Sequence, residues 1–85
     1  MKYHVVWRPE ATNQLIALWI RSVNKDAITG YVAANERILI RNPLDQGESR
    51  NVGTRLAFFR PLVLRYHVDE SLRVVTILSL GWCGR

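Results

Sequence analysis

The spacing of apolar residues changes near the middle of the chain. Between positions 11 and 39 they recur every three or four residues, which is the period of a helix packed on one side. After position 51 they gather in short runs rich in Val, Ile, Leu and Phe, which are typical of strands. The segment RNPLDQGESR, residues 41–50, separates the two patterns and contains a Pro and a Gly, which end helices and turn chains.

These patterns predict an order of elements. YHVVW at 3–7 is short, aromatic and β-branched, and predicts a first strand. Pro9 suits the first turn of a helix, which carries an apolar stripe as far as Val23. Asn24 supplies a capping side chain for a second helix, which ends before Pro43. Three further strands are predicted at VGTRLAFF (52–59), LVLRYHV (62–68) and RVVTILSL (73–80).

The short links between these elements restrict the topology. Two helices joined by so short a link must lie antiparallel as a hairpin. The last three strands are joined by tight turns and therefore pair antiparallel. The order strand, helix, helix, strand, strand, strand predicts one α+β domain over residues 1–85, with the helical hairpin packed on one face of an antiparallel sheet.

Alternation along the strands predicts which side chains the helices cover. Because the hairpin can cover only one side of the sheet, the other side stays open. On 62–68 the covered set is expected to be Leu62, Leu64, Tyr66 and Val68. The open set is expected to contain Arg65, His67 and Arg73, with Arg55 as a further candidate, on a bed that includes Val75 and Ile77. We interpret this half-apolar, Arg-bearing face as a docking surface.

The charge of the chain indicates which class of partner it binds. The formal net charge is +5, and ten of the twelve basic residues are Arg. The planar guanidinium suits phosphate and carboxylate groups, so the composition favours an anionic partner over a face that is merely solvated. Nucleic acid and an acidic protein segment both fit this description.

Other features of the composition argue against a membrane protein or a metalloprotein. No apolar run approaches the roughly 20 residues needed to cross a bilayer, and MKYHVVWRPE lacks the pattern of a signal peptide. We therefore expect a cytoplasmic protein with no membrane partner. The lone Cys83 cannot form an internal disulfide, and no metal-ligand spacing surrounds it, so we expect neither a metal nor a cofactor.

Several segments together carry a family resemblance. They are VVWRPEA near the N-terminus, LIALWI in the first helix, ILIRNPLDQGESR after the second, and RLAFFRPLVLRYHVDESLRVVTILSL near the end. The spacing from Arg55 to Tyr66 and the YHVDE…VVTIL pattern are the most specific parts. On these residues, which cover nearly the whole chain, the protein resembles the RelE/ParE toxin superfamily, the toxin halves of bacterial type II toxin–antitoxin pairs.

The resemblance implies a small cytoplasmic toxin whose partner is an acidic antitoxin protein. Ile16 and Ile20 widen the apolar stripe of the first helix beyond what a small sheet needs. They are therefore candidate antitoxin-binding residues, with burial in the core as the alternative.

The resemblance leaves the target open. RelE-like toxins cut messenger RNA on the ribosome, ParE-like toxins block DNA gyrase without doing chemistry, and a degenerate member would bind only its antitoxin. The Lys, Arg and Tyr that RelE-like toxins use are largely unmatched here. Val63 stands where an Arg is expected, and Trp82 and Cys83 replace basic residues after the last strand.

The candidate site residues come from the expected open face. An imidazole suits general-base work at neutral pH, so His67 and Arg65 are the candidate catalytic base and charge stabiliser. Arg55, Arg65 and Arg73 are candidates for binding nucleic acid or another target. Arg55 has a structural alternative, which is to anchor its strand, and Tyr66 is expected to pack in the core with its hydroxyl satisfied.

Overall fold

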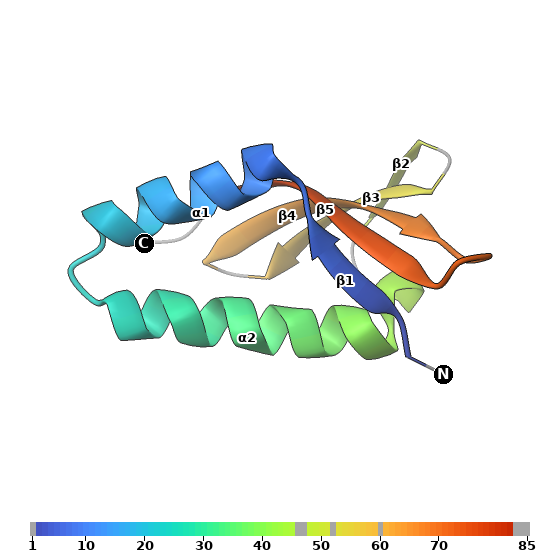
Figure 1. Ribbon diagram of the computed structural model, residues 1–85, viewed down its shortest axis with the longest axis horizontal. Helices are drawn as coiled ribbons and strands as arrows, with labels where there is room; N and C mark the ends of the chain where they lie inside the picture. The colour runs from blue at the N-terminus through green and yellow to red at the C-terminus, as the bar shows by residue number, and fades with distance from the viewer. Residues whose placement is uncertain (1, 46–47, 52, 60, 83–85) are drawn as a thin grey trace.

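The computed structural model describes residues 2–45, 48–51, 53–59 and 61–82. These residues form β1 (His4–Trp7), α1 (Pro9–Arg21), α2 (Lys25–Arg41), a short 3-10 turn (Pro43–Asp45), β2 (Glu48–Asn51), β3 (Thr54–Phe59), β4 (Leu62–Asp69) and β5 (Val74–Trp82), as Figure 1 shows. The expected strand, helical hairpin and three final strands are all present. β2 is an additional strand.

The ends of the helices follow from local sequence. α1 begins at Pro9, and Arg8 before it makes no side-chain capping hydrogen bond. The side chain of Asn24 caps α2 by accepting a hydrogen bond from the backbone N–H of Ala27 at 3.0 Å. Pro43 disfavours helical dihedral angles at Asn42, and α2 accordingly ends one residue earlier. The two helices run antiparallel, as expected (Figure 1).

The five strands form one mixed sheet in the order β1-β5-β4-β3-β2. β2 pairs antiparallel with β3, β3 with β4, and β4 with β5. β1 pairs parallel with β5, with His4 opposite Val74, so the expectation of a wholly antiparallel sheet is wrong. The physical reason is that tight turns fix the direction of the last strands, whereas nearly the whole chain separates β1 from β5.

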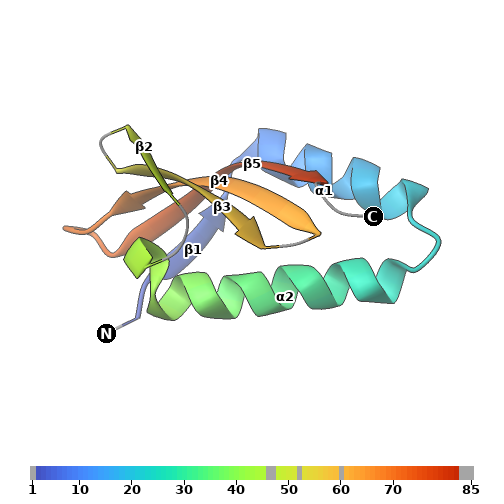
Figure 2. The same ribbon diagram turned by 180° about the vertical axis from the view of Figure 1, so that it is seen from behind.

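β2 lies at the edge of the sheet farthest from β1, on the outer side of β3 (Figure 2). Its sequence, ESRN, has no alternating apolar positions, and no strand is predicted there from the sequence. It becomes a strand by pairing with β3 across a turn in which Gly53 has a φ of 77°. The strand expected at 52–59 begins at Thr54, and position 52 lies outside the described residues.

The hydrophobic core lies between the sheet and the helices. The four β4 residues expected on the covered side are at most 5% exposed: Leu62, Leu64, Tyr66 and Val68. Both helices contribute to the same core, with Ala11, Leu15 and Leu18 from α1 and Val32 and Leu39 from α2. The expected packing of a helical hairpin on one face of the sheet is confirmed.

β5 departs from simple alternation. Val75 and Ile77, which we expected on the open side, are fully buried. The register between β4 and β5 shifts so that Arg65 faces Ser79 while Tyr66 faces Ile77, which leaves Leu78 as an extra residue. After this bulge the backbone N–H of Leu80 donates a hydrogen bond to the side-chain oxygen of Gln14 in α1, at 2.6 Å. The helix thus provides a hydrogen-bond partner for a backbone group of the sheet.

Candidate functional site

The uncovered side of the sheet, which we call the open face, carries the candidate catalytic pair. Arg65 is exposed and His67 is half-buried, and both alternate along β4 with the buried core residues. Because the two residues are two positions apart on one strand, their Cα atoms are about 6.6 Å apart. The expectation that both lie on the open face is confirmed.

Arg65 is positioned by a neighbour on β5. Its Nε donates a hydrogen bond to Oγ of Ser79 at 3.3 Å, and the two residues are register partners. This bond uses one of the five N–H donors of the guanidinium. The outer nitrogens are therefore suited to meet a phosphate or a carboxylate above the sheet.

His67 lies against the backbone of the β2–β3 turn. A Cβ placed on Gly53 would stand 2.7 Å from Nε2 and 3.1 Å from Cδ2 of His67. Gly53, with its φ of 77°, therefore supplies both the turn and the space that the imidazole occupies. This contact restricts the imidazole to one side of the turn, although its proposed catalytic role remains a prediction.

Arg55 does not join this pair. It is the register partner of Tyr66 and therefore lies on the covered side of the sheet, so its assignment to the open face is wrong. Burial raises the pKa of the Tyr66 hydroxyl, and the charge and hydrogen bond of Arg55 act in the opposite direction. The same hydroxyl donates a hydrogen bond to the carbonyl of Pro43 at 2.7 Å. The expectation that Tyr66 is buried with a satisfied hydroxyl is confirmed, and the geometry favours the strand-anchoring alternative for Arg55.

Arg73 also lies away from the pair. It precedes β5, which begins at Val74, and it has a φ of 56°, so it does not follow the alternation of that strand. Its guanidinium carbon lies 5.4 Å from the centre of the Tyr3 ring. The expected place of Arg73 on the open face is therefore wrong, and its role in binding a target remains a prediction.

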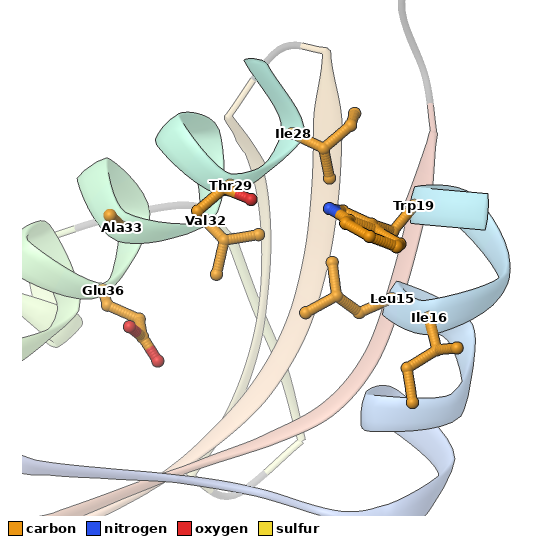
Figure 3. A pocket seen from close by; sticks show the side chains of 8 residues that line it. All are labelled: Leu15, Ile16, Trp19, Ile28, Thr29, Val32, Ala33 and Glu36. Atoms are coloured by element: carbon orange, nitrogen blue, oxygen red, sulfur yellow. The ribbon is translucent and has the colours of Figure 1, made fainter. Parts of the chain in front are cut away.

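A second candidate surface lies between the helices. Side chains of α1 and α2 surround a hollow of about 320 Å³ (Figure 3), which we call the interhelix hollow; they are Leu15, Ile16, Trp19, Ile28, Thr29, Val32, Ala33 and Glu36. The lining is almost wholly apolar. Its one carboxylate, on Glu36, accepts a hydrogen bond from Nε1 of Trp7 at 2.7 Å.

The apolar surface continues toward the link between the helices. A second hollow of about 610 Å³ shares Ile28 with the first and is also lined by Leu18, Arg21, Val23, Tyr31 and Trp82. Trp19, at the edge of the interhelix hollow, carries the ammonium group of Lys25 above its ring, 5.2 Å from the ring centre. Two cationic side chains, Arg21 and Lys25, thus border this apolar surface.

Ile16 and Ile20 belong to this surface rather than to the core. Ile16 is 48% exposed and Ile20 is 64% exposed, so the alternative that both are buried in the core is wrong. Ile16 lines the interhelix hollow, and Ile20 follows one turn later on α1. Their role in binding an antitoxin stays a prediction.

The described residues contain neither a metal-binding cluster nor a membrane-spanning helix. There, no group of three or more His, Cys, Asp or Glu side chains is placed to hold a metal ion. Neither α1 nor α2 is long and apolar enough to cross a bilayer. Cys83 lies outside the described part of the chain.

Comparisons by sequence and by structure give different results. No protein-family model matches the chain, and no curated protein matches it significantly. The RelBE2 toxin–antitoxin complex of Mycobacterium tuberculosis contains a chain with 24% identity and a TM-score of 0.78, with coverage of 96% of this chain and 99% of that one. The chromosomal ParDE TA system of P. aeruginosa gives 14% identity and a TM-score of 0.72, covering 95% and 96%. The DinJ–YafQ toxin–antitoxin complex of E. coli gives 13% identity and a TM-score of 0.71, covering 96% and 93%.

These likenesses define the structural class of the protein. Over nearly its whole length, the chain has the fold shared by the RelE, ParE and YafQ toxin–antitoxin structures. The fold that the sequence motifs led us to expect is therefore confirmed.

Sequence reasoning missed one side chain of the open face. Phe58 is the register partner of Val63, and its side chain is 56% exposed. The pairing of β3 with β4 determines its direction. Because Ala57 is opposite the buried Leu64, the next residue on β3, Phe58, points to the other side of the sheet.

Proposed function

We propose that this chain is the toxin of a toxin–antitoxin pair and that an acidic antitoxin segment docks on its helices. The observation that carries the proposal is the fold likeness to the RelBE2 toxin–antitoxin complex, which has a TM-score of 0.78 and covers 96% of this chain. The ParDE and DinJ–YafQ likenesses support the same assignment.

The helical surface supports a protein partner. Four large apolar side chains line the two hollows and remain exposed: Ile16, Trp19, Val23 and Tyr31. Ile20 is also exposed, one turn after Ile16 on α1. Apolar anchors at helical spacing favour an amphipathic partner helix laid along the hollow. Arg21, Lys25 and the net charge of +5 favour an acidic sequence for that helix.

Controlled expression tests this proposal. Induction of the chain is expected to stop bacterial growth, and co-expression of the small acidic protein encoded beside it is expected to restore growth. Ile16→Glu together with Ile20→Glu is expected to weaken capture of that protein at least tenfold, because two apolar anchors and the charge balance are lost. Asn13→Glu together with Ala17→Glu adds the same two charges, also four residues apart, at exposed positions of α1 that line neither hollow, and serves as the control. Unaltered capture by the double variant would remove the helices as the docking site.

For the target, we propose RNA cleavage at the ribosome by Arg65 and His67. His67 would take the proton of a 2′-hydroxyl while O2′ bonds to phosphorus, and the P–O5′ bond would break with protonation of O5′ by water. The products are a 2′,3′-cyclic phosphate and a 5′-hydroxyl. Arg65 would offset the charge that develops on the phosphorane. The proposal is supported by the exposure of Arg65, the half-exposure of His67 and their common place on the open face.

A second candidate is inhibition of DNA gyrase by binding alone. Two observations favour it: the fold likeness to the ParDE system, and Val63 on the open face where RelE-like toxins have an Arg. Binding requires only a complementary surface and no proton transfer. If induction has no effect on growth, the third alternative remains, in which the chain binds an antitoxin and nothing else.

Replacing Arg65 and His67 together by Ala separates the two targets. Growth arrest and cleavage of ribosome-bound messenger RNA are expected to fall at least a hundredfold in this variant, because both base and charge stabiliser are lost. Arg21→Ala removes an exposed cation from α1 and serves as the control. Full growth arrest by the double variant, together with inhibition of supercoiling in a purified gyrase assay, would favour the binding mechanism instead.

A further inference from the structure

Phe58 is a large aromatic side chain that is exposed on the open face. It is 56% exposed, and it points away from the core because its register partner Val63 alternates with the buried residues Leu62 and Leu64. An exposed Phe of this kind contributes little to folding stability. Its place on the same face as Arg65 makes Phe58 a candidate for binding a ligand there.

The residues beside Phe58 on the open face are small or apolar. Phe58, Val63 and Gly81 lie in one row across β3, β4 and β5. A Cβ on Gly81 would stand 3.2 Å from Cγ1 of Val63. The Val63 side chain therefore lies close to Gly81, which has no side chain of its own. Leu56, two positions before Phe58 on β3, is half-buried on the same side. The exposed side chain of Phe58 and the lack of a side chain at Gly81 leave this row accessible from above the sheet.

Arg65 lies in the next row of the open face. Its row contains Leu56, Arg65 and Ser79, and rows on one side of a sheet are about 6.6 Å apart. His67 lies one row further, beside Thr54 and Thr76. The open face thus presents an aromatic ring, a guanidinium and an imidazole in successive rows, a spacing that an extended nucleotide can span.

We propose that Phe58 is a stacking platform for a nucleobase and that single-stranded RNA crosses the open face from Phe58 toward Arg65 and His67. An aromatic face binds a base through stacking, whatever its sequence, and a neighbouring guanidinium binds the adjoining phosphate. The net charge of +5 complements the RNA backbone. The proposal rests on the proposed RNA-cleaving function for the choice of RNA as ligand, and it goes further by placing a base next to the scissile phosphate.

Binding of a short, unstructured, fluorescently labelled RNA to the purified protein tests the proposal. The RNA is methylated at its 2′-oxygens, which removes the nucleophile, so that binding is measured without cleavage. Phe58→Ala is expected to weaken binding by roughly 5- to 100-fold, the usual loss for one stacked base. Phe58→Trp is expected to retain or strengthen binding, and Phe58→Leu, which keeps an apolar side chain without an aromatic face, to behave like Phe58→Ala. Leu72→Ala removes an exposed apolar side chain from the β4–β5 turn and is expected to change nothing.

The salt dependence of binding distinguishes stacking from charge. Arg65→Ala is expected to reduce the slope of log affinity against log salt by about one, because one phosphate contact is lost, whereas Phe58→Ala lowers the affinity without changing the slope. Unchanged RNA affinity in Phe58→Ala, or equal behaviour of the Leu and Trp variants, overturns the proposal. Loss of antitoxin capture with unchanged RNA binding also overturns it, because Phe58 is then a protein contact.

The growth assay distinguishes a failure of the stacking proposal from a failure of the toxin assignment. If the wild-type chain does not arrest growth, the toxin assignment fails, whereas the RNA measurement still decides the role of Phe58. If the wild-type chain arrests growth and cuts RNA while Phe58→Ala does both at full rate, the stacking proposal fails and the toxin assignment stands.

Discussion

The two sides of β4 have different physical roles. Toward the helices, Leu62, Leu64, Tyr66 and Val68 are at most 5% exposed, and each is fixed by its neighbours in the core. Away from the helices, Arg65 is exposed and His67 is half-buried. Burial therefore explains the residues on the covered side, whereas it does not account for the basic and aromatic residues of the open face.

The largest expected contrast between the two sides comes from one substitution made on each. Leu64→Ala is expected to lower the free energy of unfolding by about 2–5 kcal/mol, since Leu64 is only 2% exposed and its removal leaves a cavity. Leu56→Ala, the same change on the half-buried open side, is expected to cost about 1 kcal/mol or less. Chemical denaturation of both variants measures the difference. Equal losses would mean that the open face is packed against something in the free protein.

The next effect concerns the hydroxyl of Tyr66 on the covered side. Tyr66→Phe is expected to cost about 1–3 kcal/mol, because the Pro43 carbonyl loses its donor. Burial raises the pKa of Tyr66 above its ordinary value of 10.0, so the folded state holds this proton more tightly than the unfolded state. The resulting stability is complete below about pH 10 and is lost as the pH rises through the folded pKa. Unfolding measured between pH 8 and about pH 11 should therefore show a steeper alkaline loss for the wild type than for Tyr66→Phe.

A smaller effect of opposite sign is expected at the buried polar residue of α2. The side-chain nitrogen of Asn35 has no hydrogen-bond partner among the described residues, and Asn35 is only 7% exposed. Asn35→Leu is expected to raise the free energy of unfolding by about 1–2 kcal/mol, because an unsatisfied amide is replaced by an apolar group. Asn35→Asp is the matched opposite and should destabilise. Thermal unfolding of both variants measures the sign, and a loss in Asn35→Leu would contradict the assignment of an unsatisfied amide.

The smallest effect on stability is expected on the open face itself. Arg65→Ala removes an exposed hydrogen bond to Ser79 and should change the free energy of unfolding by about 0.5 kcal/mol or less. The same variant is expected to weaken RNA binding. Its stability and its RNA affinity can therefore be measured on one protein sample and compared. A loss of stability above about 2 kcal/mol would mean that Arg65 supports the fold, and its functional role would need another test.

Part of this architecture was predictable because it depends on local chemistry. The cap at Asn24, the helix start at Pro9 and the end of α2 before Pro43 follow from single residues and their neighbours. The antiparallel order of β3, β4 and β5 follows from tight turns. The placement of Arg65 and His67 on the open face follows from alternation along one regular strand.

Features that depend on pairing between strands were not predictable in the same way. Arg55 was placed on the wrong side because its orientation is set by the register of β3 against β4. Val75 and Ile77 were placed on the wrong side because the bulge at Leu78 changes the alternation along β5. β2 has a polar sequence and becomes a strand only beside β3. Phe58 was overlooked for the same reason as Arg55, since the run AFF gives no indication of which ring is covered.

The sequence by itself determined the helical hairpin, the three final strands and the basic character of the chain, because each depends on residues close together along it. The tertiary structure decided the parallel pairing of β1, the side of the sheet on which each β3 and β5 residue lies, and the hollow between the helices. These features arise from contacts between residues far apart in sequence, and a shift of one position in strand register moves every side chain to the opposite face.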